Sequence, residues 1–122
     1  MVTIRIKNLR LRTYIGFNDE EMKKRQDVVI NIVFSYKADE AAETDDVKYA
    51  VNYRTITKEV IHLVENGRFM LLERLAADVL ELVMDNPLIA RAEVEVDKPH
   101  ALRFSDSVSA SVRADSIGEP DA

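Results

Sequence analysis

The stretch Glu93-Val94-Glu95-Val96-Asp97-Lys98-Pro99-His100 alternates between charged and apolar side chains, as a β-strand with one buried face does. Carboxylates occupy the first, third and fifth positions, and valines occupy the two positions between them. Lys98 falls in phase with the valines, and Pro99 follows it at once. The pattern therefore predicts a strand over residues 90–98 that directs a lysine along its buried face.

Three further segments have a two-residue period, and they extend the predicted sheet. Residues 2–15 alternate but slip by one position near Lys7-Asn8, which indicates a β-bulge inside a long strand. Gly16 ends this strand. Residues 27–36 and residues 106–114 alternate as well, so we expect four strands in total.

Two segments between the second and third strands have the period of amphipathic helices. Asn52 can cap a helix that begins at Tyr53, and Asn66-Gly67 can end it. A second helix is predicted over about residues 69–84, with Asn86-Pro87 ending it.

The remaining segments are predicted to be loops. Residues 17–26 form a charged loop, and the acidic residues 39–46 form a loop that could hold one helical turn. Residues 115–122 are expected to form a flexible polar tail.

The element order β-β-α-α-β-β predicts a single α+β domain over residues 1–114. Its four-stranded antiparallel sheet has both helices on one face. Such a sheet leaves two long edges and a partly polar second face uncovered, and open edges favour pairing with another subunit. We therefore expect several sheets to join into an oligomeric barrel with the helices outside.

The composition excludes several functions. The 122 residues are 47% hydrophobic and 32% charged with a net charge of −5, which suits one domain and disfavours general nucleic-acid binding. There are no cysteines, and His62 and His100 form no metal-binding motif. We find no signal peptide and no apolar stretch that suits a membrane span, so we expect a cytoplasmic protein.

Four polar residues stand where apolar or neutral ones would serve the fold: Lys98, Glu73, Tyr53 and Glu21. Each has an ordinary structural explanation, which is the more frequent one when each residue is taken alone. Together they suggest proton transfer on a flat heterocycle. A carboxylate near a helix N-terminus can bind a guanidine-like edge, and a partly desolvated lysine can exchange protons near neutral pH.

Short segments along most of the chain carry a resemblance to a known family. They are Ile4–Thr13, Ile15-Gly16, Glu20-Glu21, Arg25–Asp27, Asn52–Thr55, Val64–Asn66, Arg68-Phe69, Leu71–Glu73, Ala92–Glu95, Asp97-Lys98, His100–Arg103 and Asp106–Ser109. Over about residues 3–113 the chain resembles the dihydroneopterin aldolase family. His100 and Arg103 stand where aldolases usually carry a glycine and small residues, as in the family's epimerases. The tryptophan that often precedes the loop glutamate in aldolases is replaced by Glu20.

The resemblance implies an architecture and a set of roles. The architecture is the tunnelling fold, a homo-octamer of two stacked tetrameric rings with sites at subunit interfaces. Glu73 beside Leu72 would hold the pterin, Lys98 would act as acid and base, and Tyr53 would lie over the substrate. Glu21 would complete the site from the next subunit.

The resemblance also implies the substrate: 7,8-dihydroneopterin triphosphate, inverted at C2′ without metal or cofactor and with weak aldolase side activity. His100 and Arg103 would hold the triphosphate, with Lys23, Lys24 and Arg25 as weaker candidates. Two alternatives stay open at this point. One is a dihydroneopterin aldolase that releases glycolaldehyde, and the other is a non-catalytic ring that binds a pterin or purine. Neither nucleic acid nor membrane is an expected partner.

Overall fold

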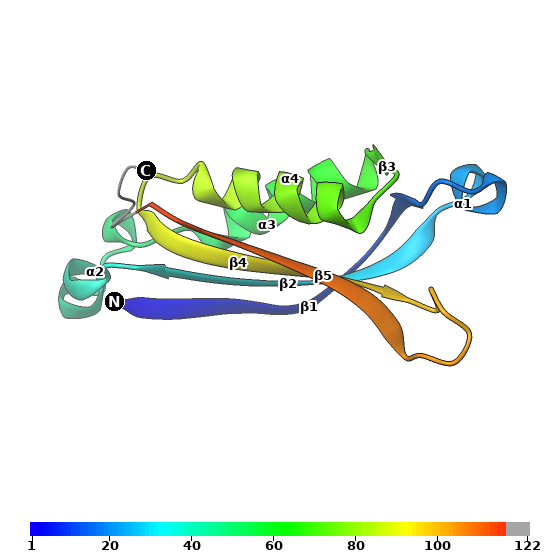
Figure 1. The fold of residues 1–122 in the computed structure, drawn as a ribbon. Helices are drawn as coiled ribbons and strands as arrows, with labels where there is room; N and C mark the ends of the chain where they lie inside the picture. The colour runs from blue at the N-terminus through cyan, green and yellow to red at the C-terminus, as the bar shows by residue number, and fades with distance from the viewer. Residues whose placement is uncertain (117–122) are drawn as a thin grey trace.

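The computed structural model describes residues 1–116, which form one mixed sheet with helices on one face (Figure 1). The strands follow the order β3-β1-β2-β4-β5 across the sheet. Four are long and antiparallel, and the short β3 runs parallel to the end of β1. Their bounds are β1 (Val2–Ile15), β2 (Gln26–Tyr36), β3 (Arg68–Phe69), β4 (Ile89–Pro99) and β5 (Ser107–Asp115). The predicted α+β fold is confirmed, with β3 as an addition.

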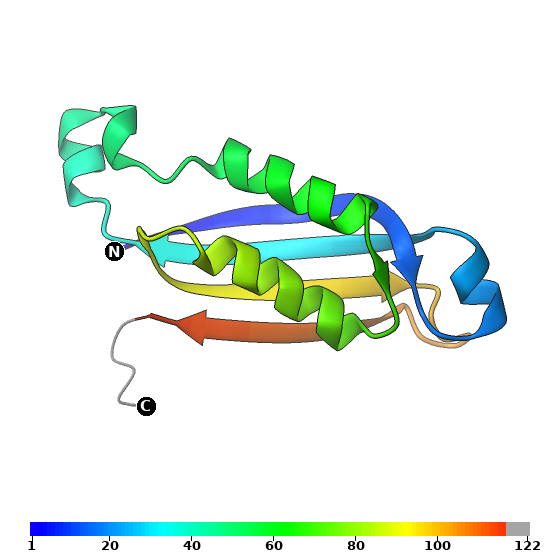
Figure 2. The same ribbon diagram turned by 90° about the horizontal axis from the view of Figure 1, so that it is seen from above.

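Two long helices, α3 (Tyr53–Glu65) and α4 (Leu72–Met84), lie side by side across the sheet (Figure 2). Asn52 caps α3 as predicted, because its side chain accepts hydrogen bonds from the N–H groups of Arg54 and Thr55. The remaining helical segments are short: α1 (Asp19–Lys23), α2 (Asp39–Thr44) and the 3₁₀ turn η1 (Val47–Tyr49). Within residues 1–116, no helix is long and apolar enough to cross a membrane.

The core lies between the two helices and the sheet face that they cover. Alternate residues of β2 and β4 meet aliphatic residues spaced along α3 and α4, and each fully buried aliphatic side chain stabilises the fold by roughly 1.5–3 kcal/mol. The fully buried positions include Val28, Ile30, Ile32, Phe34, Val60, Val64, Leu75, Val79, Val83, Val94 and Val96. The predicted buried face of residues 90–98 is therefore confirmed.

The predicted bulge in β1 is present and explains the slip in the hydrophobic pattern. The register between β1 and β2 shifts between Ile6 and Leu9, and Asn8 adopts a positive φ of 54°. The Asn8 N–H donates to Oδ1 of Asn31 across the strands (2.9 Å). Because one residue is inserted, apolar side chains on both sides of the bulge face the helices.

The sheet divides into two arms at one end, which we call the split end. Pairing between β2 and β4 reaches only to Val29 and Asp97. Beyond that pair, β1 and β2 stay paired as far as Thr13 and Gln26, and β4 and β5 as far as Pro99 and Ser107. Figure 1 shows the two arms curving apart on the side of α1 and β3.

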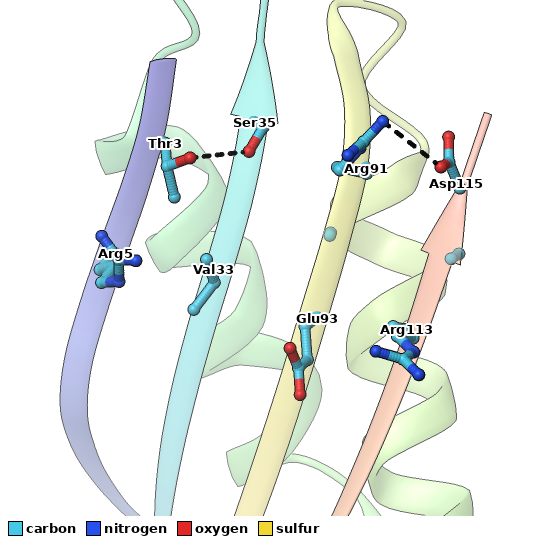
Figure 3. Close-up of a pocket in the computed structure, with 10 residues that line it drawn as sticks. Thr3, Arg5, Val33, Ser35, Arg91, Glu93, Arg113 and Asp115 are labelled. Carbon is cyan, nitrogen blue, oxygen red and sulfur yellow. Dashed lines mark hydrogen bonds and ion pairs between the residues drawn. The ribbon is translucent and has the colours of Figure 1, made fainter. Parts of the chain in front are cut away.

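The second face of the sheet carries no helix and is lined by charged and hydroxyl side chains (Figure 3). It holds a shallow hollow of about 840 Å³ away from the split end. Thr3 and Ser35 hydrogen-bond there through their hydroxyl groups (3.0 Å), and Arg91 pairs with Asp115 (3.6 Å). A face with this chemistry suits contact with water rather than packing against a second apolar layer.

The sheet extends slightly beyond the predicted domain boundary at residue 114. Asp115 ends β5, and the Ser116 N–H donates to the Ala90 carbonyl (2.7 Å). The rest of the predicted tail, residues 117–122, lies outside the described residues.

Candidate active site

Lys98 and Glu21 form a partly buried ion pair at the split end. Lys98 Nζ lies 2.5 Å from Glu21 Oε2, and the two side chains are only 12% and 22% exposed. Lys98 belongs to the β4 arm, whereas Glu21 lies on α1, which joins β1 to β2. The lysine on the buried face of β4 therefore reaches across the split to a carboxylate on the other arm.

The local sequence fixes the position of Glu21. Asn18 caps α1, and its Oδ1 accepts a hydrogen bond from the Glu21 N–H (2.8 Å). In return, Glu21 Oε1 accepts from the N–H groups of Phe17 (3.2 Å) and Asn18 (3.4 Å). This reciprocal arrangement is a capping box, and it directs the second carboxylate oxygen towards Lys98.

Gly16 makes room for this carboxylate. Its φ is +130°, and a Cβ atom there would lie 2.2 Å from the Glu21 carboxyl carbon. Its N–H donates to the Phe69 carbonyl (2.8 Å), which holds the corner between β1 and α1 against β3. Any larger residue at position 16 would displace Glu21.

Electrostatics keep Glu21 ionised. The hydrogen bond from Lys98 lowers the pKa of the Glu21 carboxyl, and this outweighs the opposite effect of its partial burial. The hydrogen bonds from Asn18 and Phe17 act in the same direction as Lys98. The Glu21 carboxylate also offsets part of the cost of removing the Lys98 ammonium from water.

Glu73 and Leu72 lie at the same end of the sheet as the ion pair. They form the first turn of α4, which directly follows β3 at the split end (Figures 1 and 2). Two backbone carbonyls tie this region to α1: Gly16 binds the Phe69 carbonyl, and Arg68 Nη1 binds the Met22 carbonyl (3.3 Å). Glu73 is exposed and, within the described part of the chain, no hydrogen bond or ion pair engages its carboxylate.

Tyr53 lies at the opposite end of the sheet. It begins α3, whose other end is held at the split end by a hydrogen bond from Arg25 to the Glu65 carbonyl (3.2 Å). The 13 residues of α3 span about 20 Å at ~1.5 Å per residue, so Tyr53 of the same chain is far from Lys98. Tyr53 is 53% exposed and is not among the buried residues of α3, which are Ile56, Val60 and Val64.

His100 and Arg103 follow Lys98 on the turn between β4 and β5, and both are exposed. His100 has a positive φ of 65°. The Arg103 guanidinium lies 5.5 Å from the Phe104 ring, which is 95% exposed. Lys23 and Lys24 lie in the last turn and cap of α1, and Arg25 precedes β2.

Two differences from the sequence-based expectations stand out. Glu21 pairs with Lys98 of its own chain, whereas we expected it from the next subunit. Residues 17–26 were expected to form a loop, but they contain α1. Asn18 and Glu21 have the three-residue spacing of a capping box. That spacing was the signal for the helix, and it also identifies Asn18 as a residue that the sequence analysis missed.

The sequence matches a known protein family over most of its length. Residues 4–113 match the family model described as dihydroneopterin aldolase. The chain is 57% identical to the dihydroneopterin triphosphate 2′-epimerase of Pseudomonas aeruginosa, with 89% of both sequences covered. It is 56% identical to the enzyme of that name from Escherichia coli K12, with 87% of this chain and 88% of the relative covered.

A solved structure has the same fold. The dihydroneopterin aldolase of E. coli in complex with neopterin superimposes with a TM-score of 0.88 at 30% sequence identity, covering 93% of this chain and 99% of that one.

Proposed function

The chain belongs to the dihydroneopterin aldolase family, and we propose that it inverts C2′ of 7,8-dihydroneopterin triphosphate to give the dihydromonapterin form. The observation that carries this proposal is that the sequence of this chain is more similar to the family's epimerases than to its aldolases. Identity is 57% and 56% with two epimerases over 89% and 87% of this chain, but 30% with the E. coli aldolase of known structure. The enzyme is accordingly an isomerase with a weak lyase side activity.

Glu73 is proposed to hold the pterin ring. A carboxylate can accept two parallel hydrogen bonds from the 2-amino and N3 positions, which together have the shape of a guanidine edge. The position supports this role, because Glu73 is exposed in the first turn of α4 and the N-cap residue, Leu71, makes no side-chain cap. Leu72, half-buried beside it, would contact the ring.

Lys98 is proposed to transfer the protons, with Glu21 holding it in place. Removal of the 2′-hydroxyl proton lets the C1′–C2′ bond break, so that C2′ becomes an aldehyde. The electron pair of that bond moves onto C1′ and into the C6=N5 unit of the dihydropterin. The pterin itself accepts the electrons, so Lys98 needs to move a proton and forms no covalent bond to the substrate.

The fate of the aldehyde fragment separates the two activities. If the fragment turns over and C1′ adds to its other face, the C1′–C2′ bond reforms with C2′ inverted. If the fragment leaves and C1′ takes a proton, the result is the aldolase products. A site that holds the triphosphate end of the fragment would favour inversion, because it would slow release.

Tyr53 is proposed to reach the site from a second subunit. Its distance from Lys98 within one chain and the charged helix-free face support a ring of subunits, as does the outer edge of β5, which pairs with no strand of residues 1–116. We propose the homo-octamer of two stacked tetrameric rings that the family resemblance implies. The cytoplasmic location expected from the sequence stays a prediction.

Product stereochemistry tests the proposed function. Purified protein is incubated with 7,8-dihydroneopterin triphosphate, and the oxidised, dephosphorylated product is separated from neopterin on a chiral column. We expect accumulation of monapterin. Recovery of neopterin alone would refute the epimerase.

The aldolase is the second candidate, because an aldolase shares the fold at a TM-score of 0.88. Glycolaldehyde released from unphosphorylated dihydroneopterin, at a rate above that of inversion of the triphosphate, would favour it. The third candidate, a non-catalytic ring that binds a pterin or purine, predicts no turnover of either substrate.

A further inference from the structure

A small hollow lies at the split end, lined in part by the two residues that follow the proposed catalytic lysine. Its volume is about 270 Å³, below the range of about 300–1,000 Å³ typical of pockets for whole ligands. Both arms of the sheet line it, through Arg10, Leu11, Arg12, Asp27, Val28, Val29, Pro99 and His100. Because pairing between β2 and β4 stops at Val29 and Asp97, the hollow occupies the place where the arms separate.

The charges around the hollow favour an anion. Arg12 Nε pairs with Asp27 Oδ1 (3.2 Å), so the one carboxylate that lines the hollow among residues 1–116 is already compensated. Arg10 is exposed and, across residues 1–116, no hydrogen bond or ion pair engages its guanidinium. An arginine in this state has five N–H donors available in a geometry that matches phosphate oxygens.

His100 adds a ring N–H donor at a costly backbone position. Its φ of 65° lies in the left-handed region, which favours glycine and which histidine adopts less readily. Strained residues of this kind cluster at functional sites, where the surrounding structure holds them. Glycine would fit this backbone conformation better, so the function of the imidazole, rather than the shape of the turn, explains why histidine occupies position 100.

The hollow and the proposed catalytic lysine lie at the same end of β4 but on different faces of the sheet. His100 is two residues beyond Lys98, so at ~3.3 Å per residue their Cα atoms are at most about 7 Å apart. Arg10, Arg12 and Asp27 are exposed and alternate with the buried Leu11 and Val28, so the hollow opens on the helix-free face of the sheet. Lys98 instead reaches Glu21 on the face that the helices cover. A substrate with C2′ at Lys98 would extend its phosphorylated end into the hollow by passing between the two arms, beyond Val29 and Asp97, where their pairing ends.

We propose that this hollow is the polyphosphate subsite of the enzyme, with Arg10 and His100 as the donors to the phosphate oxygens. The inference rests on the proposed function, since it assigns one part of that substrate to one part of the structure. Its size suits a fragment of the ligand and not the pterin ring. Arg12 contributes by compensating Asp27.

A second group of arginines lies around Tyr14 and can be compared with those that line the hollow. The guanidiniums of Arg68 and Arg25 lie 3.9 and 5.4 Å from the centre of the Tyr14 ring. Each also binds a backbone carbonyl, of Met22 and Glu65 respectively. These arginines connect α1, α3 and β3, so we assign them to the fold and not to the substrate.

Kinetics with two substrates test the subsite. In R10A and H100G, we expect the ratio of kcat/KM for 7,8-dihydroneopterin triphosphate to that for unphosphorylated dihydroneopterin to fall about tenfold or more, as expected for lost hydrogen bonds to a charged group. Glycine at position 100 accepts the positive φ, so H100G removes the imidazole without adding backbone strain. R5A, on the same strand but lining the larger hollow of Figure 3, should leave the ratio unchanged. Equal losses for both substrates in R10A and H100G, or a fall of the ratio only in R25A or R68A, would overturn the subsite.

Binding of inorganic tripolyphosphate separates this inference from the proposed function. Titration calorimetry should show tripolyphosphate binding to the wild-type protein and at least about tenfold weaker binding to R10A. If the wild-type protein binds tripolyphosphate in this way but produces no monapterin, the epimerase assignment fails and the anion site stands. If the wild-type protein produces monapterin but R10A and H100G bind tripolyphosphate as well as it does, the subsite fails and the epimerase stands.

Discussion

At the scale of single residues, the site depends on an ammonium and a carboxylate that stabilise each other in a partly buried position. The sequence singled out both residues: Lys98 because it is in phase with Val94 and Val96, and Glu21 because it resembles the family's loop glutamate. It did not show that Glu21 would meet Lys98, since 77 residues separate them and only the tertiary fold brings them together. A short-range pattern reports which face a side chain occupies, but not its distant partner.

Replacement of Lys98 tests its role in proton transfer. In K98A, we expect kcat for inversion of the triphosphate to fall by about 10²–10⁴-fold, as is typical when a general acid or base is removed. Pterin affinity should be retained, because Glu73 is untouched. Steady-state kinetics and fluorescence titration with neopterin measure the two quantities. A variant that keeps its turnover would rule out Lys98 as the acid and base.

The ion pair also predicts how stability depends on pH. The Glu21 carboxyl has a folded-state pKa below its ordinary value, so it contributes stability that is fully present above about pH 4.3, the ordinary value for glutamate. That contribution is lost as pH falls through the lower folded-state pKa. The free energy of unfolding of wild type should therefore exceed that of E21Q at pH 7, and the two should converge in acid. Urea titrations at several pH values measure this difference; a constant gap would contradict it.

At the scale of secondary-structure elements, the long segments were predicted well and the short ones were not. The strands and α3 and α4 follow clear periods, and the bulge at Asn8 was visible as a change of phase. By contrast, α1 and β3 are too short to show a period, so they depend on the capping box of Asn18 and on pairing with β1. These two elements are the ones that build the site around the split end.

Substitution of Asn18 tests whether α1 positions the catalytic pair. In N18A, the loss of the cap should destabilise α1 by about 1 kcal/mol and release Glu21, so kcat should fall. N18S is the matched control, because serine caps helices about as well as asparagine and should preserve most of the activity. Kinetics on both variants, with thermal unfolding as the measure of stability, decide the question. If N18A and N18S lose the same activity, the cap is not what positions Glu21.

At the scale of the whole molecule, one chain brings together only three of the four proposed residues. Glu73, Glu21 and Lys98 gather at the split end, whereas Tyr53 lies at the far end of α3. The sequence placed Tyr53 at a helix start but could not show which end of the sheet that start would occupy, because that depends on the direction in which α3 crosses the sheet. Within the part of the chain that the structure describes, β5 has an open edge and Tyr53 is separated from Lys98, and shared sites between neighbouring subunits would explain both.

Mixed oligomers test this sharing of sites. Y53A and K98A should each be nearly inactive alone, and Tyr53 is exposed enough for its loss to leave the fold intact. In a ring where each site takes Lys98 from one subunit and Tyr53 from the next, random assembly of the two variants in equal amounts restores about a quarter of the sites. Co-expression, purification of the mixed species and measurement of kcat per subunit give the result. If both residues acted within one chain, every subunit would carry one defect and mixing would restore nothing. A return of about a quarter of wild-type activity can therefore come only from sites built by two chains.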